Sequence, residues 1–103
     1  MKTYNKLIRD KIPEIIKSSG KNFDIHSAKK EEILLLLETK LNEEVSEYQE
    51  AKNLEELADI MEVLFGLANA LGYSEQDLIN KRNEKKEERG GFEKGIVLEK
   101  VYE

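Results

Sequence analysis

Two acidic pairs lie near the middle of the chain, Glu44-x-x-Glu47 and Glu56-x-x-Asp59. Residues three apart on a helix share a face, so each pair would direct two carboxylates to the same side. Residues 52–53, Lys-Asn, lie between the pairs and predict a helix break. If the chain turns back there, the four carboxylates face each other across a helical hairpin. Oxygen ligands grouped in this way suit a hard divalent cation such as Mg²⁺.

A solvated acidic surface is the alternative interpretation, because 38% of the residues are charged. The positions of two acids argue against it. Glu44 lies three residues after Leu41 and borders the apolar stripe of its helix, and Asp59 lies within the apolar segment 58–60. A carboxylate close to a core must be neutralised, paired or bound to a metal. Spacing alone leaves both interpretations open.

Two long helices must position these acids. The apolar periodicity predicts one helix over Lys29–Ala51 and a second over Leu54–Leu71, with Asn53 as the N-cap of the second. The apolar stripe expected on the first helix consists of Leu34, Leu37, Leu41, Val45 and Tyr48. The core face expected on the second consists of Leu54, Leu57, Ala58, Met61, Leu64, Phe65, Ala68 and Leu71.

The second long helix carries a further apolar side, formed by Ile60, Val63 and Leu67. A helix that is apolar nearly all round is either central in a bundle or covered by another subunit. A chain of 103 residues has little material with which to surround it. We therefore expect a homo-oligomer, either a dimer or a dimer of dimers.

Shorter elements are predicted on both sides of the hairpin. Asp10 can act as an N-cap, and Pro13 fits the first turn of a short helix. A last helix is expected over residues 74–89, where Ser74 and Asp77 have the spacing of a capping box.

Alternating residues predict two short strands, near 23–27 and 96–102, which can pair into a small two-stranded β element. His26, the single histidine, is expected on the surface of the first strand rather than as a ligand. The predicted fold class is therefore mainly α, a helical bundle with a small β element, in a single domain over residues 1–103.

The composition argues against several classes of protein, including nucleic-acid binders, disulfide-bonded proteins and membrane-spanning proteins. The net charge of −5 argues against a non-specific nucleic-acid binder, which needs a basic face. The absence of cysteine excludes disulfides and thiolate metal sites. The N-terminal residues have no apolar run typical of a signal peptide, and the longest apolar-rich segment, Ile60–Leu71, is too short to span a bilayer. We expect a cytoplasmic protein without a membrane partner.

The combined motifs resemble those of the MazG-like all-alpha nucleoside triphosphate pyrophosphohydrolases, a superfamily that includes phosphoribosyl-ATP pyrophosphohydrolase. The two core motifs are EEVSE at Glu43–Glu47 and EELADIMEVLFGLANALGY at Glu55–Tyr73. The flanks KLIRDKIPEII, Lys6–Ile16, and ERGGFEKGIVL, Glu88–Leu98, are similar to a small single-domain branch of that superfamily. Together these segments account for most of the chain.

The resemblance implies an activity that depends on Mg²⁺, or alternatively on Mn²⁺. A nucleoside triphosphate would be cleaved between its α and β phosphates to give a nucleoside monophosphate and pyrophosphate, in the removal of non-standard nucleotides. Glu44, Glu47, Glu56 and Asp59 would be the metal ligands and catalytic residues, and one glutamate could orient or deprotonate the attacking water. Only eight residues separate Glu47 from Glu56, so the turn is tight and no nucleotide-covering insertion is present.

Further site candidates follow from position on the second long helix. Glu62 lies three residues after Asp59 on the same face and can hold a metal or a water. Asn69 continues that face, and it could bind a base or sugar or be a buried amide satisfied by backbone groups. Gly66 would let a substrate or a neighbouring helix approach closely.

Positive charge for phosphate binding has two candidate sources. Lys81, Lys85 and Arg89 recur every four residues on one helical face, which could equally be a solvated face paired with nearby glutamates. The glycines at 90–91 follow directly, and their bare amides can cradle phosphate. Arg9, with the neighbouring Lys11, forms the second set.

Two other functions compete with this interpretation. One is phosphoribosyl-ATP hydrolysis in histidine biosynthesis, which the sequence does not separate from cleavage of other nucleotides. The other is a non-catalytic oligomeric helical module that uses the same apolar faces and treats the acids as solubilising groups. Asp59, inside an apolar helix, favours the enzyme, because a scaffold has no reason to keep an acid there.

Overall fold

A computed structural model describes residues 2–103, and in that range the chain forms four helices and no strand. The helices are α1 (Ile12–Ser18), α2 (Lys30–Ala51), α3 (Leu54–Ala70) and α4 (Glu75–Arg89). The prediction of a mainly α fold is confirmed. None of the described helices is both long enough and apolar enough to cross a membrane.

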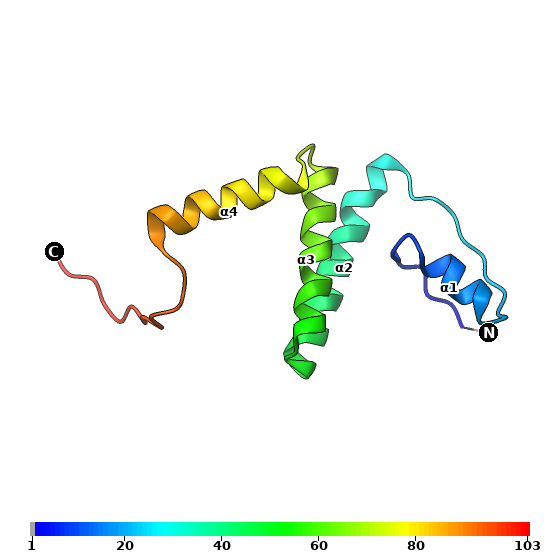
Figure 1. Cartoon of the computed structure of the whole chain (residues 1–103), viewed down its shortest axis with the longest axis horizontal. Coiled ribbons are helices and arrows are strands. Elements are labelled where there is room, and N and C mark those ends of the chain that lie inside the picture. The colour runs from blue at the N-terminus through cyan, green and yellow to red at the C-terminus, as the bar shows by residue number, and fades with distance from the viewer. Residues whose placement is uncertain (1) are drawn as a thin grey trace.

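The helices α2 and α3 form an antiparallel hairpin at the centre of the molecule (Figure 1). The turn between them uses Lys52 in the left-handed conformation, with φ of 51°, as the C-cap of α2. The Asn53 side-chain oxygen then accepts a hydrogen bond of 3.0 Å from the backbone N–H of Glu56, which caps α3. The predicted break at residues 52–53 and the predicted N-cap are both confirmed.

Close packing of the hairpin depends on Gly66. A Cβ atom built at this position would lie 3.0 Å from Cδ2 of Leu37 on the facing helix. The neighbouring-helix role expected for Gly66 is therefore confirmed. Around this contact lie the buried apolar residues of the described chain, Leu37, Val63 and Ala68, so the core is small.

The core face predicted for α3 is confirmed only in part for the chain on its own: Ala68 is buried and Phe65 is partly buried. Leu54, Leu57, Met61, Leu64 and Leu71 are exposed, and Leu54 retains 80% of its accessible surface. The side packed on α2 instead contains Val63, with Ile60 and Leu67 partly buried. The physical reason is that α2 is the one long helix against α3, so it covers only one of the two apolar sides.

Helix α4 extends away from the hairpin rather than folding back onto it (Figure 1). Its capping box is confirmed: Oγ of Ser74 accepts from the backbone N–H of Asp77 at 3.0 Å, and the Asp77 carboxylate accepts from the N–H of Ser74 at 2.9 Å. The radius of gyration is 18.1 Å. A compact chain of this length has about 13 Å, so the protomer is elongated.

The predicted two-stranded β element is wrong. Residues 23–27 and 96–102 have no strand structure. They lie at opposite ends of the molecule, the first in the link from α1 to α2 and the second in the C-terminal tail (Figure 1). Because α4 carries the tail away from the N-terminal half, the two segments have no partner within one chain. The predicted N-cap of α1 also differs, since Lys11 occupies it without a side-chain hydrogen bond.

The close contact at Gly66 predicts a measurable cost for a side chain there. Gly66→Val should lower the free energy of unfolding by about 1–3 kcal/mol, because overpacking pushes Leu37 and the two helices apart. Chemical denaturation followed by circular dichroism measures this cost. Ala51→Val, at an exposed helical position, is the control and should change stability by less than about 0.5 kcal/mol. An equal effect of the two substitutions would contradict the packing role.

Candidate metal centre

Three carboxylates converge where α2 and α3 face each other. One oxygen from each of Glu44, Glu56 and Asp59 lies within 4.8 Å of the others. Glu44 comes from α2, whereas Glu56 and Asp59 are three residues apart near the start of α3 and share one face. The Asn53 cap fixes where α3 begins and hence which way that face points. The predicted convergence of carboxylates across the hairpin is therefore present for three of the four acids.

Glu44 is buried at this contact, with 6% of its surface accessible. Its Oε2 atom has no hydrogen-bond partner, and Oε2 of Glu56 is also buried without one. Burial is the main cause that raises the pKa of Glu44, and the nearby Glu47 carboxylate raises it further while Lys40 opposes the shift. An unpartnered buried acceptor costs about 1–3 kcal/mol, and more when it is charged.

A divalent cation fits this arrangement. Mg²⁺ binds oxygens at about 2.1 Å in an octahedron, which places adjacent ligands about 3.0 Å apart and opposite ligands about 4.2 Å apart. The three oxygens lie within 4.8 Å of one another, so side-chain adjustment can bring them to that geometry. A cation would also satisfy the unpartnered oxygens of Glu44 and Glu56. The cluster of Glu44, Glu56 and Asp59 can therefore hold a metal ion.

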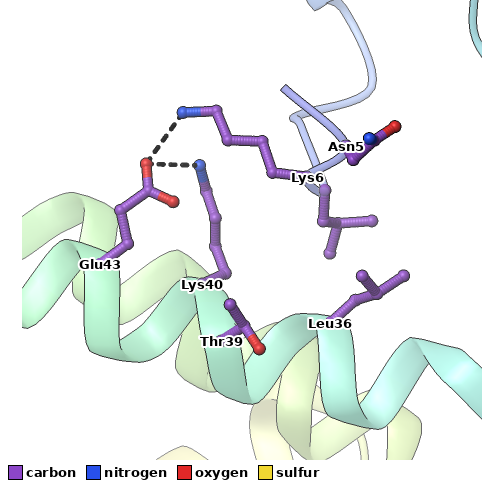
Figure 2. A pocket seen from close by; sticks show the side chains of 7 residues that line it. Asn5, Lys6, Leu36, Thr39, Lys40 and Glu43 are labelled. Atoms are coloured by element: carbon purple, nitrogen blue, oxygen red, sulfur yellow. Dashed lines mark hydrogen bonds and ion pairs between the residues drawn. The ribbon is translucent and has the colours of Figure 1, made fainter. Parts of the chain in front are cut away.

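Two lysines meet at the acid next to Glu44. Nζ of Lys6 donates to Oε1 of Glu43 at 2.9 Å, and Nζ of Lys40 lies 3.6 Å from the same oxygen (Figure 2). The hydrogen bond from Lys6 is the main cause that lowers the pKa of Glu43. The small cavity beside these residues, about 30 Å³, lies between the N-terminal segment and α2 and is far smaller than a small-molecule site.

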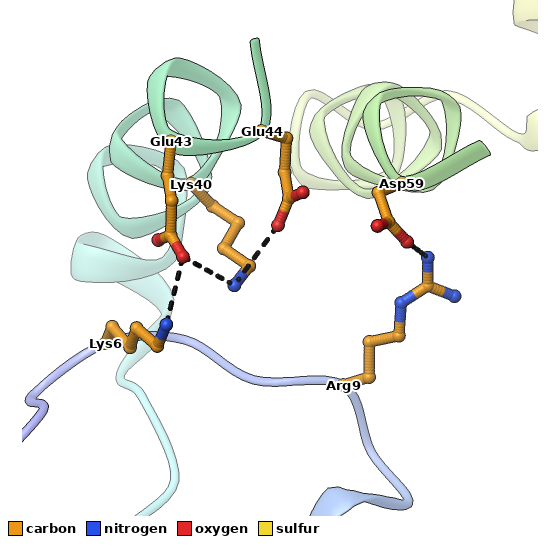
Figure 3. Close-up of polar contacts among 6 residues, drawn as sticks. All are labelled: Lys6, Arg9, Lys40, Glu43, Glu44 and Asp59. Atoms are coloured by element: carbon orange, nitrogen blue, oxygen red, sulfur yellow. Dashed lines mark hydrogen bonds and ion pairs between the residues drawn. The ribbon is translucent and has the colours of Figure 1, made fainter. Parts of the chain in front are cut away.

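Cations also flank the metal cluster itself. Nζ of Lys40 lies 3.4 Å from Oε1 of Glu44, and Nη2 of Arg9 donates to Oδ1 of Asp59 at 2.7 Å (Figure 3). Arg9 comes from the segment before α1, so the N-terminal residues cross the site. The ion pair agrees with the expectation that an acid in this position is paired.

A groove of about 720 Å³ opens beside the cluster. Its walls come from the N-terminal segment, α2 and α3. The charged and polar side chains that line it include Arg9, Lys11, Lys30, Lys40, Glu62 and Asn69. This volume lies in the range of small-molecule sites, about 300–1,000 Å³.

The other predicted site residues are placed as follows. Glu47 is exposed and lies outside the three-oxygen cluster, although it is close enough to raise the pKa of Glu44. Glu62 and Asn69 are exposed residues that line the groove. The α4 residues Lys81, Lys85 and Arg89 do not line it, and Lys81 is ion-paired with Glu84 at 3.1 Å.

Lys40 and Lys6 were not predicted. Lys40 precedes Glu44 by four residues, a spacing that allows an ion pair on one helical face, so the sequence contained a signal. Lys6 meets Glu43 across 37 positions of sequence, and such a contact has no local signature.

Comparisons with known proteins give no relative: no family model, curated protein or solved structure matches the chain. The likeness to the MazG-like enzymes therefore remains a resemblance of motifs.

The buried acid predicts a specific dependence of stability on pH. The pKa of Glu44 is raised in the folded chain. At pH values between the ordinary glutamate pKa and this raised pKa, Glu44 therefore binds a proton when the chain folds. The metal-free protein should lose the stability associated with this group as the pH rises through that interval. Glu44→Gln should remove this component, so the variant gains stability over wild type as the pH rises.

Thermal melts in a chelator between about pH 4 and 8 measure the difference between the two proteins. Glu38→Gln, the same substitution at an exposed position of α2, is the matched control. A wild-type to Glu44→Gln difference that stays constant with pH would contradict the assignment.

Proposed function

We propose that the protein is a Mg²⁺-dependent nucleotide pyrophosphohydrolase that cleaves between the α and β phosphates of a nucleoside triphosphate. The observation that carries the proposal is the buried Glu44 carboxylate with an unpartnered oxygen, grouped with Glu56 and Asp59. A surface acid needs no such burial, whereas a metal ligand benefits from it, because a drier site strengthens its interaction with the cation.

The groove supports a nucleotide as the substrate class. Acids and cations line it side by side, with Arg9 paired to Asp59 and Lys40 beside Glu44, an arrangement suited to a ligand that is itself a metal-bound polyanion. Asn69 offers an amide for the base or sugar, and Glu62 offers a carboxylate one turn beyond Asp59. Glu47 completes the ligand set through a side-chain rotation toward its neighbour Glu44. Mn²⁺ is an alternative metal, since it prefers the same oxygen ligands.

In the proposed reaction the metal ion and the side chains of the protein have different roles. When bound, the cation neutralises phosphate charge and lowers the pKa of a coordinated water. The chain's carboxylates hold the cation, and one of the exposed glutamates, Glu47 or Glu62, accepts the proton of the attacking water. Cations on the groove wall orient the phosphates. The products are a nucleoside monophosphate and pyrophosphate, and the proposed role is the removal of non-standard nucleotides.

A substrate panel tests the activity. The protein should release pyrophosphate, and not orthophosphate, from at least one member, and only with Mg²⁺ or Mn²⁺ present. The panel should include canonical and modified nucleoside triphosphates and phosphoribosyl-ATP. Glu44→Gln and Asp59→Asn should each lower turnover at least 100-fold while circular dichroism shows that the helices are retained. Orthophosphate as the first product, or full turnover in Asp59→Asn, would rule out this mechanism.

We also propose that the working form is a dimer or a dimer of dimers. The single chain exposes 9734 Å². A compact monomer of 11.9 kDa exposes about 5,900 Å², so the chain carries roughly 3,800 Å² of additional surface. Obligate interfaces bury about 2,000–5,000 Å² counted over both partners, or about 1,000–2,500 Å² from each chain. The excess on one chain is therefore large enough for more than one such interface. The uncovered apolar side of α3 supports a second copy as the occupant, and α4 would then pack on a neighbouring chain.

Sedimentation at micromolar concentration tests the assembly. The mass should be two or four times that of the 11.9 kDa chain. Leu64→Glu, on the exposed apolar side of α3, should weaken association because it places a charge in the interface. Gln49→Glu, at an exposed polar position of α2, is the control and should leave the mass unchanged. A wild-type mass near 11.9 kDa would refute the assembly.

The exposed apolar surface also favours a second candidate function, a non-catalytic helical interaction module. Four large side chains of α3 are uncovered, as is Leu71 just after it, and the C-terminal tail adds Phe92, Ile96 and Val97. This candidate predicts association without metal-dependent turnover, so the substrate panel separates the two functions.

A further inference from the structure

We propose that Lys40 and Arg9 act as exchangeable counter-ions: they neutralise Glu44 and Asp59 in the metal-free protein and bind the substrate's phosphate oxygens once a divalent cation takes the carboxylates. The inference rests on the proposed function and deepens it, because it assigns phosphate recognition to the wall of the groove rather than to α4. The starting observation is that each cation pairs with a carboxylate of the metal cluster and also lines the groove.

Arg9 is free to change partner. Its guanidinium contacts Asp59 through one oxygen, Oδ1, and its side chain is 54% exposed. It belongs to a segment outside the helices, so a shift of the side chain breaks no helical hydrogen bond. A guanidinium presents several N–H donors in a planar fork that matches a phosphate as well as a carboxylate.

Lys40 is held loosely by two acids. Its Nζ lies 3.4 Å from Glu44 and 3.6 Å from Glu43, and no hydrogen bond is formed to either. Such distances exceed those of charge-assisted hydrogen bonds, about 2.7–2.9 Å. The side chain is 16% exposed and lines the groove, and its ammonium has no hydrogen-bonded partner among the described residues. A phosphate oxygen in the groove would supply that partner.

The charges favour the exchange. When ionised, the three cluster carboxylates carry three negative charges, and Lys40 and Arg9 carry two positive charges. The group therefore has a net charge of −1 and repels a free polyanion. A bound divalent cation reverses the sign, and the same group then carries one net positive charge. Positive charge in a walled groove attracts anions. Binding of metal and binding of phosphate are therefore coupled through these two side chains, and the ligand class is the phosphate chain rather than the base.

A different role for Arg9 would give the opposite response to metal. If Arg9 served to orient Asp59 as a ligand, its loss would weaken the binding of Mg²⁺ itself, as the loss of supporting residues does at metal sites. A counter-ion competes with the metal, so its loss leaves Mg²⁺ binding unchanged or tighter. The two roles are distinguished by the metal affinity alone, without any measurement of turnover.

Calorimetry with two probes tests the proposal on the full chain. Mg²⁺ alone is titrated first, and methylenediphosphonate, an analogue of pyrophosphate that resists hydrolysis, is titrated next at saturating Mg²⁺. The variants are Arg9→Gln, Lys40→Gln and the conservative Arg9→Lys. Lys21→Gln is the matched control, because Lys21 is exposed, does not line the groove and forms no ion pair within residues 2–103. Circular dichroism checks that each variant is folded.

We expect Arg9→Gln and Lys40→Gln to bind Mg²⁺ at least as tightly as wild type and to bind the diphosphonate at least tenfold more weakly, about 1.4 kcal/mol. Arg9→Lys should recover part of the lost affinity, and Lys21→Gln should match wild type with both probes. Weaker Mg²⁺ binding in Arg9→Gln, or unchanged diphosphonate binding in both variants, would overturn the exchange. If wild type binds Mg²⁺ and turns over substrate in that case, the proposed function survives; if wild type binds no Mg²⁺, both proposals fall.

Discussion

The Glu44 carboxylate is buried between two helices without a full set of partners, and the rest of the site depends on this constraint. Burial disfavours the charged form, and one oxygen has no hydrogen-bond donor. Two further carboxylates, from Glu56 and Asp59, increase the negative charge at the same place. Lys40 and Arg9 offset part of it, but neither reaches the unpartnered oxygen of Glu44 by a hydrogen bond. The arrangement therefore favours compensation, either by protonation of Glu44 or by the divalent cation that we propose.

The hairpin that buries Glu44 has a short turn and closely packed helices. The turn at Lys52 and Asn53 sets the phase of α3, and the missing side chain at Gly66 lets α3 approach Leu37. The same geometry leaves the opposite side of α3 uncovered. One chain thus contains the acidic face of the site, whereas a second copy would be needed to cover the apolar face. The proposed site and the proposed assembly are two consequences of one helix with two different sides.

The features of the fold that depend on neighbouring residues, namely the helix caps and the turn between α2 and α3, were largely predicted from the sequence. The caps at Asn53 and Ser74 and the bounds of the two long helices were predicted from residue type and spacing. The predicted turn at residues 52–53 then brings Glu44 to Glu56 and Asp59, but not Glu47. The failures involve long-range geometry. Residues 23–27 and 96–102 have the alternating pattern of strands, but they lie at opposite ends of the molecule and cannot pair. Helix α3 has two apolar sides, and the periodicity of its sequence does not show which side packs against α2. The Lys6–Glu43 contact joins residues far apart in sequence, so no spacing predicts it.

Thermal stability in Mg²⁺ compared with NaCl of the same ionic strength tests the central claim most directly. A ligand that binds only the folded state stabilises it by about 2.7 kcal/mol at a hundredfold excess over its dissociation constant. A metal site at Glu44, Glu56 and Asp59 therefore predicts that millimolar Mg²⁺ raises the melting temperature by several degrees beyond NaCl, and that Glu44→Gln loses this difference. Equal shifts of the wild-type melting curve in the two salts would contradict the account.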